Sequence, residues 1–177
     1  MADFKHFVTH VFRVEGGYSK SKTDKGNYNS RGQLVGTKFG ISAPTLEHHL
    51  SKIISIKDML NLAKETALKI YKTLYWDVCK TDKFSSQSVA NIIADHSVNA
   101  SPLKASRLLY DIVNKHFGGN LKVKSIITNE LVDKVNSLSQ ELLFEKIKAE
   151  RIQYYKNIGG SNLRGWLNRM ATFNFES

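Results

Sequence analysis

A carboxylate stands at the end of an amphipathic stretch near the start of this chain. The segment Glu15-Gly16-Gly17-Tyr18 follows apolar residues at helical spacing over residues 4–12, so Glu15 is predicted to lie in the last turn of a helix that the glycines end. The carbonyl end of a helix carries about half a negative charge, which raises the pKa of a carboxyl group there, and burial would raise it further. A carboxyl group that stays protonated near neutral pH can act as a general acid, which is what glycosidases use to protonate a leaving sugar oxygen.

An ordinary structural role is the alternative for Glu15. Acidic residues near helix ends are common and only some are catalytic, so these four residues alone favour a solvated glutamate with a flexible Gly-Gly cap. A glycosidase also needs a second polar or carboxylate group, which helps water or the charged sugar centre. Asp24, nine positions after Glu15, is the first candidate for that group.

An ordered set of short motifs extends this pattern along nearly the whole chain. After residues 15–18 come Asp24-Lys25-Gly26, the segment 36–42 with Thr37, Tyr75-Trp76, the segment 95–99 that runs from Asp95 to Asn99, and the segment 165–169. The set resembles glycoside hydrolase family 108, phage and bacterial N-acetylmuramidases with an E-G-G-Y helix end, a D-x-G turn, a T-x-x-G-I-[TS] segment and a C-terminal peptidoglycan-binding-like region. The resemblance implies that Glu15 is the catalytic acid, that Asp24 or Thr37 positions water or stabilises the sugar cation, and that no cofactor is required.

The chain departs from the family pattern at two places. In the family the D-x-G-G turn runs almost directly into the threonine, whereas residues 27–36 intervene here, and the Gly-Gly pair is reduced to Gly26-Asn27. Turn-forming residues at 29–32 predict that this insert is the tip of a small β-hairpin near residues 27–40. In the C-terminal half, Ile126-Ile127-Thr128 stands where the family commonly has a D-G-x-x-G turn.

Three further side chains are candidates for contact with a sugar. Tyr18 lies three residues beyond Glu15, and Tyr28 of the insert could cover a bound sugar, because an aromatic face packs well against a pyranose ring. Asn99 lies four residues after Asp95 and therefore shares a helix face with it. That pair either forms a structural hydrogen bond, which the sequence favours, or faces the cleft and holds sugar hydroxyl or acetamido groups.

Composition limits the class of protein. A chain of 177 residues with 41% hydrophobic residues can bury one substantial core, so a single domain is expected. The net charge of +10 favours polyanionic partners, including nucleic acid, an anionic membrane surface or a cell wall, although spread-out lysines also fit solvated helix faces. No nucleic-acid fingerprint is present, so nucleic acid is not an expected partner. The lone Cys79 excludes an internal disulfide, and the histidines form no metal-binding pattern.

The start of the sequence carries no apolar run typical of a signal peptide, and no stretch of about 18 apolar residues occurs. We therefore expect a monomer made in the bacterial cytoplasm, without stable membrane insertion. The family resemblance implies that it reaches the cell wall after release by a holin and acts on the glycan strands of peptidoglycan.

Helical spacing dominates the remaining sequence. Further predicted helices cover residues 43–51, a short segment opened by a Ser55/Asp58 capping box, 63–76, 87–98, 102–116, a short segment capped by Thr128, and 138–157. The sequence thus predicts a mainly helical, lysozyme-like fold with a small β-hairpin. We expect a single domain over 1–177, with a catalytic part at 1–100 and a helical, peptidoglycan-binding-like part at 101–177.

The resemblance implies an N-acetylmuramidase that cleaves the bond between N-acetylmuramic acid and N-acetylglucosamine. A lytic transglycosylase is the nearest rival, because it would use a single acid of this kind and form an anhydro sugar without water. A non-catalytic wall-binding or secretion-associated protein is the rival outside enzymes. The presence of Glu15 together with residues 16–18 favours an enzyme over a pure binder, which has no physical need for an acid at a helix end.

Overall fold

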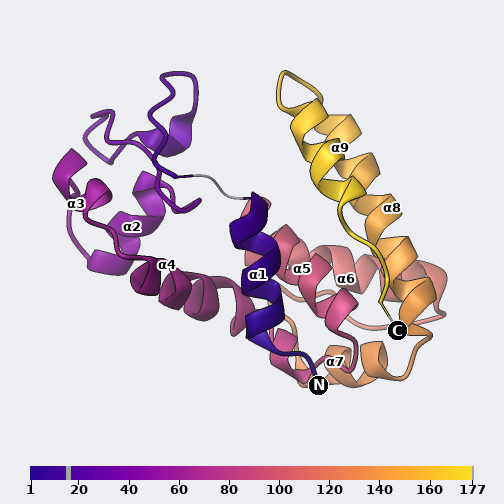
Figure 1. The fold of residues 1–177 in the computed structure, drawn as a ribbon. Coiled ribbons are helices and arrows are strands. Elements are labelled where there is room, and N and C mark those ends of the chain that lie inside the picture. The colour runs from indigo at the N-terminus through magenta and orange to yellow at the C-terminus, as the bar shows by residue number, and fades with distance from the viewer. Residues whose placement is uncertain (15–16, 177) are drawn as a thin grey trace. The chain divides into compact units, whose positions relative to one another are not determined.

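The computed structural model describes the backbone of residues 1–14 and 17–176 and the side chains of residues 1–9 and 17–176, and this part of the chain is mainly helical, as predicted (Figure 1). The chain divides into two compact units. Unit 1 comprises Met1–Phe7 and Lys72–Ser177, and unit 2 comprises Val8–Tyr71. The expectation of a single domain with a catalytic part at 1–100 stays a prediction.

Unit 2 combines short helices with a long loop. Helix α1 (Phe4–Val14) enters it, and α2 (Ala43–Leu50), α3 (Ile56–Leu60) and α4 (Lys64–Tyr71) follow the loop. Helix α2 starts where predicted, because the Ser42 side chain accepts a hydrogen bond from the backbone N–H of Thr45. The capping box of α3 is confirmed as well: Ser55 and Asp58 each accept a hydrogen bond from the other's backbone N–H.

The predicted helix at 63–76 changes character part-way. The α-helix α4 ends at Tyr71, and Lys72–Trp76 form a π-helical turn, η2, which is the first segment of unit 1 after α1. Within unit 1, the buried Trp76 ring lies 5.7 Å from the ring of Phe4 and 5.4 Å from that of Phe7. Packing of the tryptophan against two aromatic rings is thus a tertiary contact that local helical spacing does not encode.

The small β-hairpin expected near residues 27–40 does not form, since the described residues contain no β-strand. Antiparallel pairing in this region is limited to isolated bridges, namely Ser19 with Thr37, Tyr28 with Leu34, and Lys38 with Ile41. A short 3-10 helix, η1 (Lys25–Asn27), interrupts the segment. Side-chain hydrogen bonds from buried asparagines take up backbone groups that a strand ladder would otherwise pair.

Unit 1 is a helical bundle around a central buried helix. The 3-10 helix η3 (Thr81–Lys83) is followed by α5 (Gln87–Asn99), α6 (Pro102–His116), α7 (Asn129–Asn136), α8 (Gln140–Ile158) and α9 (Leu163–Ala171). Helix α5 packs against α6 and α8, and its side chains Val89, Ile92 and Ile93 are fully buried, as the sequence predicts for a central helix. Helix α9, which packs along α8, was not predicted.

A buried carboxylate ties three of these helices together. Asp95 of α5 accepts a hydrogen bond from Arg151 Nη2 of α8 at 2.7 Å, and its other oxygen accepts from Arg169 Nε and Nη2 of α9 at 2.8 and 2.6 Å. Burial by itself would raise the pKa of Asp95, but the charges of the two arginines outweigh it and hold that pKa below its usual value. The carboxylate is therefore ionised, and it bridges α5 to both α8 and α9.

Neighbouring groups complete this network without adding charge. Tyr155 accepts a hydrogen bond from Arg151 through its hydroxyl at 2.8 Å, and Trp166 of α9 stacks on the Tyr155 ring with centroids 5.3 Å apart. His96, next to Asp95, is almost fully buried, and burial together with the Arg151 charge lowers its pKa to about 3. The imidazole is consequently neutral at physiological pH, so Asp95 faces two positive charges and not three.

Replacement of Asp95 by Asn should destabilise the protein by about 3–5 kcal/mol, because Arg151 would be left as a buried charge without its counterion. Urea unfolding measures the loss, and Asp111→Asn on the exposed face of α6 is the matched control, expected to stay within about 0.5 kcal/mol of the original protein.

The pH dependence of that loss gives a second check. The folded-state pKa of Asp95 is lowered, so its contribution is present above about pH 4 and disappears as the pH falls below that value. The difference in the free energy of unfolding between the original protein and Asp95→Asn should therefore become smaller in acid. A difference that stays constant down to the acid limit of folding would contradict the ionised carboxylate.

Candidate functional site

Four of the predicted site residues lie in one loop of unit 2, residues 17–41, which connects the end of α1 to α2 (Figure 1). They are Tyr18, Asp24, Tyr28 and Thr37. Glu15 lies outside the described residues, and so does Gly16. The geometry of the site is therefore that of the loop, whose side chains are arranged by a small number of buried polar groups.

A buried asparagine joins the Asp24 turn to Thr37. Asn27 is fully buried; its Oδ1 accepts a hydrogen bond from the Thr37 hydroxyl, and its Nδ2 donates to the carbonyl of Ser21 at 2.9 Å. Its backbone N–H donates to the carbonyl of Asp24 at 3.1 Å, and its own carbonyl accepts from the N–H groups of residues 35 and 36 at 2.9 Å each. Asn27 thus fixes both ends of the insert to each other.

Asp24 is held at one oxygen and open at the other. Its Oδ1 accepts a hydrogen bond from the backbone N–H of Gly26 at 2.8 Å, which caps η1. Within the described part of the chain, Oδ2 has no hydrogen-bond partner, and the residue is exposed. One carboxylate oxygen therefore fixes the geometry, while the second is available to accept a proton or a hydrogen bond from water or a sugar hydroxyl.

Thr37 is fixed through both its backbone and its side chain. Its N–H and carbonyl pair with those of Ser19, with N to O distances of 2.8 Å in both directions. Since its hydroxyl proton is donated to Asn27, the hydroxyl oxygen can only accept further hydrogen bonds. This orientation suits positioning of a water molecule or sugar hydroxyl and not donation to a leaving group.

Tyr18 and Tyr28 both brace the loop through their hydroxyl groups. The Tyr18 hydroxyl donates to the carbonyl of Val35 at 3.0 Å, and that of Tyr28 donates to the carbonyl of Lys22 at 3.0 Å. Tyr18 remains 37% exposed, so its ring keeps an open face, and Tyr28 is half-buried. Contact of either ring with a sugar stays a prediction.

The insert is anchored to α2 and the segment that follows it. The buried Asn29 donates from Nδ2 to the carbonyl of Ile54 at 2.9 Å. Glu47 of α2 accepts from the backbone N–H groups of Ser30 and Ile54 at 3.0 and 3.2 Å. Residues 27–36 are consequently an integral part of unit 2, and Val35 contributes its side chain to the buried interior.

Asn99 belongs to unit 1, at the last turn of α5. Its amide nitrogen donates to the backbone carbonyl of Asp95 at 2.8 Å and to the Asp95 carboxylate at 3.2 Å. These bonds are those of a structural pair, the interpretation that the sequence favours. A role of Asn99 in binding substrate stays a prediction.

Sequence reasoning missed Asn27 as the organiser of this loop. The available signal was the departure from the family pattern, where the second glycine of the turn is replaced by an asparagine. It also missed that Asp95 and Arg169, which stand in two separate motif segments, contact each other directly. Both motifs therefore have a structural function in unit 1.

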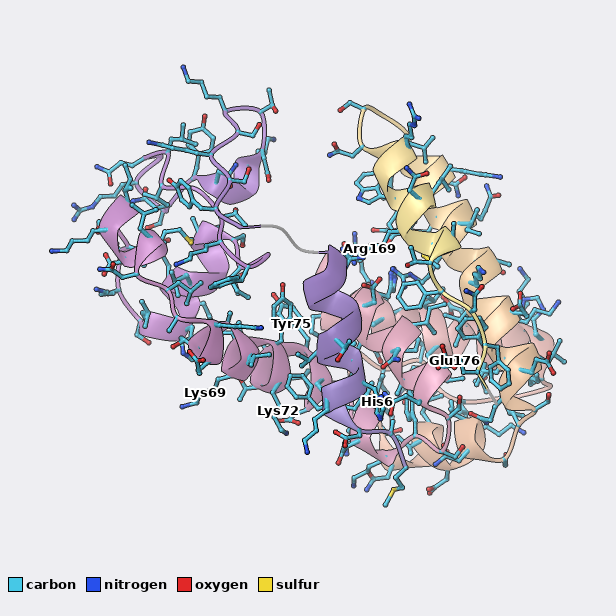
Figure 2. The ribbon with its side chains drawn as sticks, in the orientation of Figure 1. His6, Lys69, Lys72, Tyr75, Arg169 and Glu176 are labelled. Carbon is cyan, nitrogen blue, oxygen red and sulfur yellow. The ribbon has the colours of Figure 1, made fainter. Side chains whose placement is uncertain are left out.

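Hollows elsewhere in each unit lack the predicted site residues. In unit 1 a cavity of about 540 Å³ is lined by His6 and Glu176, which come from the two terminal segments, together with residues 85–87 (Figure 2). In unit 2 a hollow of about 370 Å³ is lined by residues 33–35 and 55–57. Among the described side chains no cluster of three or more His, Cys, Asp or Glu could hold a metal ion. No helix in the described ranges has the length and apolar content needed to cross a bilayer.

Comparisons with known proteins show the family from the sequence and the fold from a solved structure. The family model for glycosyl hydrolase 108 matches residues 8–100. Among solved structures, that of Brucella abortus SagA superposes with a TM-score of 0.80, covering 95% of this chain and 89% of that chain at 23% sequence identity, which shows a shared fold. No curated protein sequence matches the chain.

Gly36 provides a test of how the loop holds Tyr18. A Cβ added at Gly36 would lie 2.5 Å from Cε2 of Tyr18, and the backbone φ of Gly36 is +90°. The same Cβ would lie 2.7 Å from the Ser19 carbonyl oxygen. Gly36→Ala should therefore cost about 1–2 kcal/mol for the left-handed backbone and about 1–3 kcal/mol more for the clashes with the ring and this carbonyl.

Gly32→Ala is the matched control for this variant. Gly32 also has a positive φ, +72°, but a Cβ there would meet no atom within 4 Å. It should show only the backbone cost, and the difference between the two variants in urea unfolding measures the close contacts of residue 36 with the Tyr18 ring and the Ser19 carbonyl. Equal losses for both variants would mean that the Tyr18 ring does not pack on residue 36.

Proposed function

Because this chain belongs to the glycosyl hydrolase 108 family and is therefore a glycoside hydrolase, we propose that it hydrolyses the β-1,4 bond between N-acetylmuramic acid and N-acetylglucosamine in peptidoglycan. The observation that carries the proposal is that the family match, residues 8–100, contains Glu15 and the whole of loop 17–41. Peptidoglycan is the substrate class consistent with this family.

Glu15 is proposed as the general acid. Val14 is the last described residue of α1, and the sequence predicts that Glu15 lies at the carbonyl end of that helix, where the helix dipole disfavours a negative charge. A carboxyl group in that setting is expected to hold its proton near neutral pH and to deliver it to the glycosidic oxygen as the bond breaks.

Asp24 is proposed as the group that acts on water. The unpartnered Oδ2 of this exposed carboxylate can accept a proton from an attacking water molecule, while the bond from Gly26 to Oδ1 keeps the carboxylate in one orientation. Thr37 supports this step by accepting a hydrogen bond from the same water or from a sugar hydroxyl. A negative charge beside the reacting sugar also stabilises its oxocarbenium-like transition state.

Tyr18 is proposed as a sugar platform beside these groups. Its hydroxyl bond to Val35 and its packing on Gly36 fix the ring, and its exposed face can stack on a pyranose. Tyr28 and Asn99 are proposed as further contacts with the sugar. The Tyr28 hydroxyl already donates a hydrogen bond within unit 2, and the Asn99 amide already donates one within unit 1.

Digestion of purified peptidoglycan, followed by mass spectrometry of the fragments, tests the proposed bond. New reducing ends on N-acetylmuramic acid would support it. New reducing ends on N-acetylglucosamine would place the cleavage at the other glycosidic bond, and the absence of fragments would leave a wall-binding protein as the better account.

Glu15→Gln should lower the rate of wall lysis by roughly a hundredfold or more, because the amide keeps the shape of the side chain but has no acidic proton. The rate is measured by the fall in turbidity of a peptidoglycan suspension. Glu65→Gln, at an exposed position in the first turn of α4, is the matched control and should retain the original rate. Activity of Glu15→Gln within a few-fold of the original protein would remove Glu15 from the mechanism.

Asp24→Asn separates the charge of this residue from its structural function. The amide oxygen can still accept the hydrogen bond from Gly26, so the fold should persist while kcat falls by about 10²-fold or more through loss of the base. Thr37→Val, which loses the bond to Asn27, should instead lower stability as well as activity. If Asp24→Asn keeps its kcat while Thr37→Val loses it and Thr37→Ser, which retains the hydroxyl, keeps it, the second group is Thr37 and not Asp24.

A further inference from the structure

The turn that carries Asp24 is crowded with lysines. Lys20, Lys22 and Lys25 are all exposed, and none of them forms an ion pair with another described residue. The segment 17–41 holds five basic residues and a single acid, Asp24, so its formal charge is +4. This positive charge therefore lies in the same loop as the candidate site.

Some exposed lysines elsewhere in the protein are neutralised by a neighbour. Lys52 pairs with Asp58 at 2.7 Å, and Lys115 pairs with Glu150 at 3.0 Å. The three lysines of the Asp24 turn have no such partner in the described part of the chain. Their mutual repulsion is therefore not offset by a neighbouring carboxylate. Their positive charge is therefore available to an anionic ligand.

The backbone beneath these lysines is held in place. The carbonyl of Ser21 accepts from Asn27 Nδ2 at 2.9 Å, the carbonyl of Lys22 accepts from the Tyr28 hydroxyl at 3.0 Å, and Asp24 caps the turn at Gly26. A fixed backbone reduces the ordering that binding requires, so the lysines are presented at a defined place beside Asp24.

We infer that the cationic turn formed by Lys20, Lys22 and Lys25 binds carboxylates of the peptide that branches from N-acetylmuramic acid, and so makes the enzyme select peptide-bearing glycan. The inference rests on the proposed function. Asp24 is proposed to act at the cleaved bond, so the lysines beside it would contact an anionic group of the substrate close to that bond. The peptide carries carboxylates there, whereas the glycan chain to which it is amide-linked is uncharged.

The kind of side chain fits a flexible peptide. A lysine ammonium is a hydrated point charge on a long mobile stem, with no demand for a planar, bidentate partner. Several such charges can follow carboxylates whose positions vary from one peptide to the next. A phosphate-bearing wall polymer would also be attracted to lysines. Binding of such a polymer, however, would not require the lysines to lie in the turn that carries Asp24.

The experiment compares two soluble substrates that differ only in charge. One is a purified glycan oligomer that carries its peptides and is free of phosphate polymers; in the other, the peptide carboxylates are converted to methylamides. The quantity measured is the ratio of kcat/KM for the two substrates. Exposed ion pairs contribute roughly 1.4- to 5-fold each, so the original protein should prefer the charged substrate by about five- to tenfold, mainly through KM.

The variant Lys20→Gln/Lys22→Gln/Lys25→Gln should bring this preference close to one. The variant Lys122→Gln/Lys124→Gln/Lys156→Gln removes the same charge from exposed positions of unit 1 and should keep the preference. Raising the salt concentration should reduce the preference of the original protein and of this control, because exposed charges are screened over about 10 Å at 0.1 M salt and over about 3 Å at 1 M. If the triple variant of the turn does not fold, the three single variants carry the same comparison.

Three results would overturn the inference while the proposed function stands. The original protein could cleave both substrates equally well, or the turn variant could lose activity equally on both, which would mean that the lysines act through Asp24. A loss seen only on walls with attached phosphate polymers would assign the turn to those polymers instead. Failure of the original protein to cleave either substrate would remove the proposed function together with the inference.

Discussion

The loop that carries the candidate site has no strand ladder, so its backbone polar groups need individual partners. Asn27 is central to this pairing: its backbone bonds residues at both ends of the insert, and its buried side-chain amide bonds the Ser21 carbonyl and the hydroxyl of Thr37. Buried polar groups without partners cost about 1–3 kcal/mol each, which is why this network specifies one loop conformation. Its chemical consequence is the contrast between Asp24, with one free carboxylate oxygen, and Thr37, whose hydroxyl can only accept.

A different polar constraint organises unit 1. Asp95 alone in the bundle interior would be expensive to bury, and so would Arg151, but each neutralises the charge of the other, and Arg169 of α9 also bonds Asp95. The motif segments 95–99 and 165–169 are far apart in sequence and meet through this contact. The contact between Asp95 and Arg169 therefore gives both segments a structural function in joining α5, α8 and α9.

Local signals in the sequence predict what depends on local physics. The capping residues Ser42 and Ser55 and the apolar run of α5 place their helices correctly, because each rests on contacts within a few residues. The π-helical turn that ends at Trp76 packs on Phe4 and Phe7, which are distant in the chain. The replacement of the hairpin by isolated bridges depends on hydrogen bonds of Asn27 that its local sequence pattern does not indicate. Among the site residues, Asp24 and Thr37 are predicted by motif, whereas their link through Asn27 requires the folded loop.

The central claim is that the enzyme breaks the muramic acid linkage with water, and isotopic labelling addresses it most directly. Purified peptidoglycan is digested in water enriched in oxygen-18, and the fragments are examined by mass spectrometry. Hydrolysis requires the heavy oxygen to be incorporated at the new reducing end of N-acetylmuramic acid. Release of unlabelled anhydro-muramic ends would contradict the account and identify a transglycosylase.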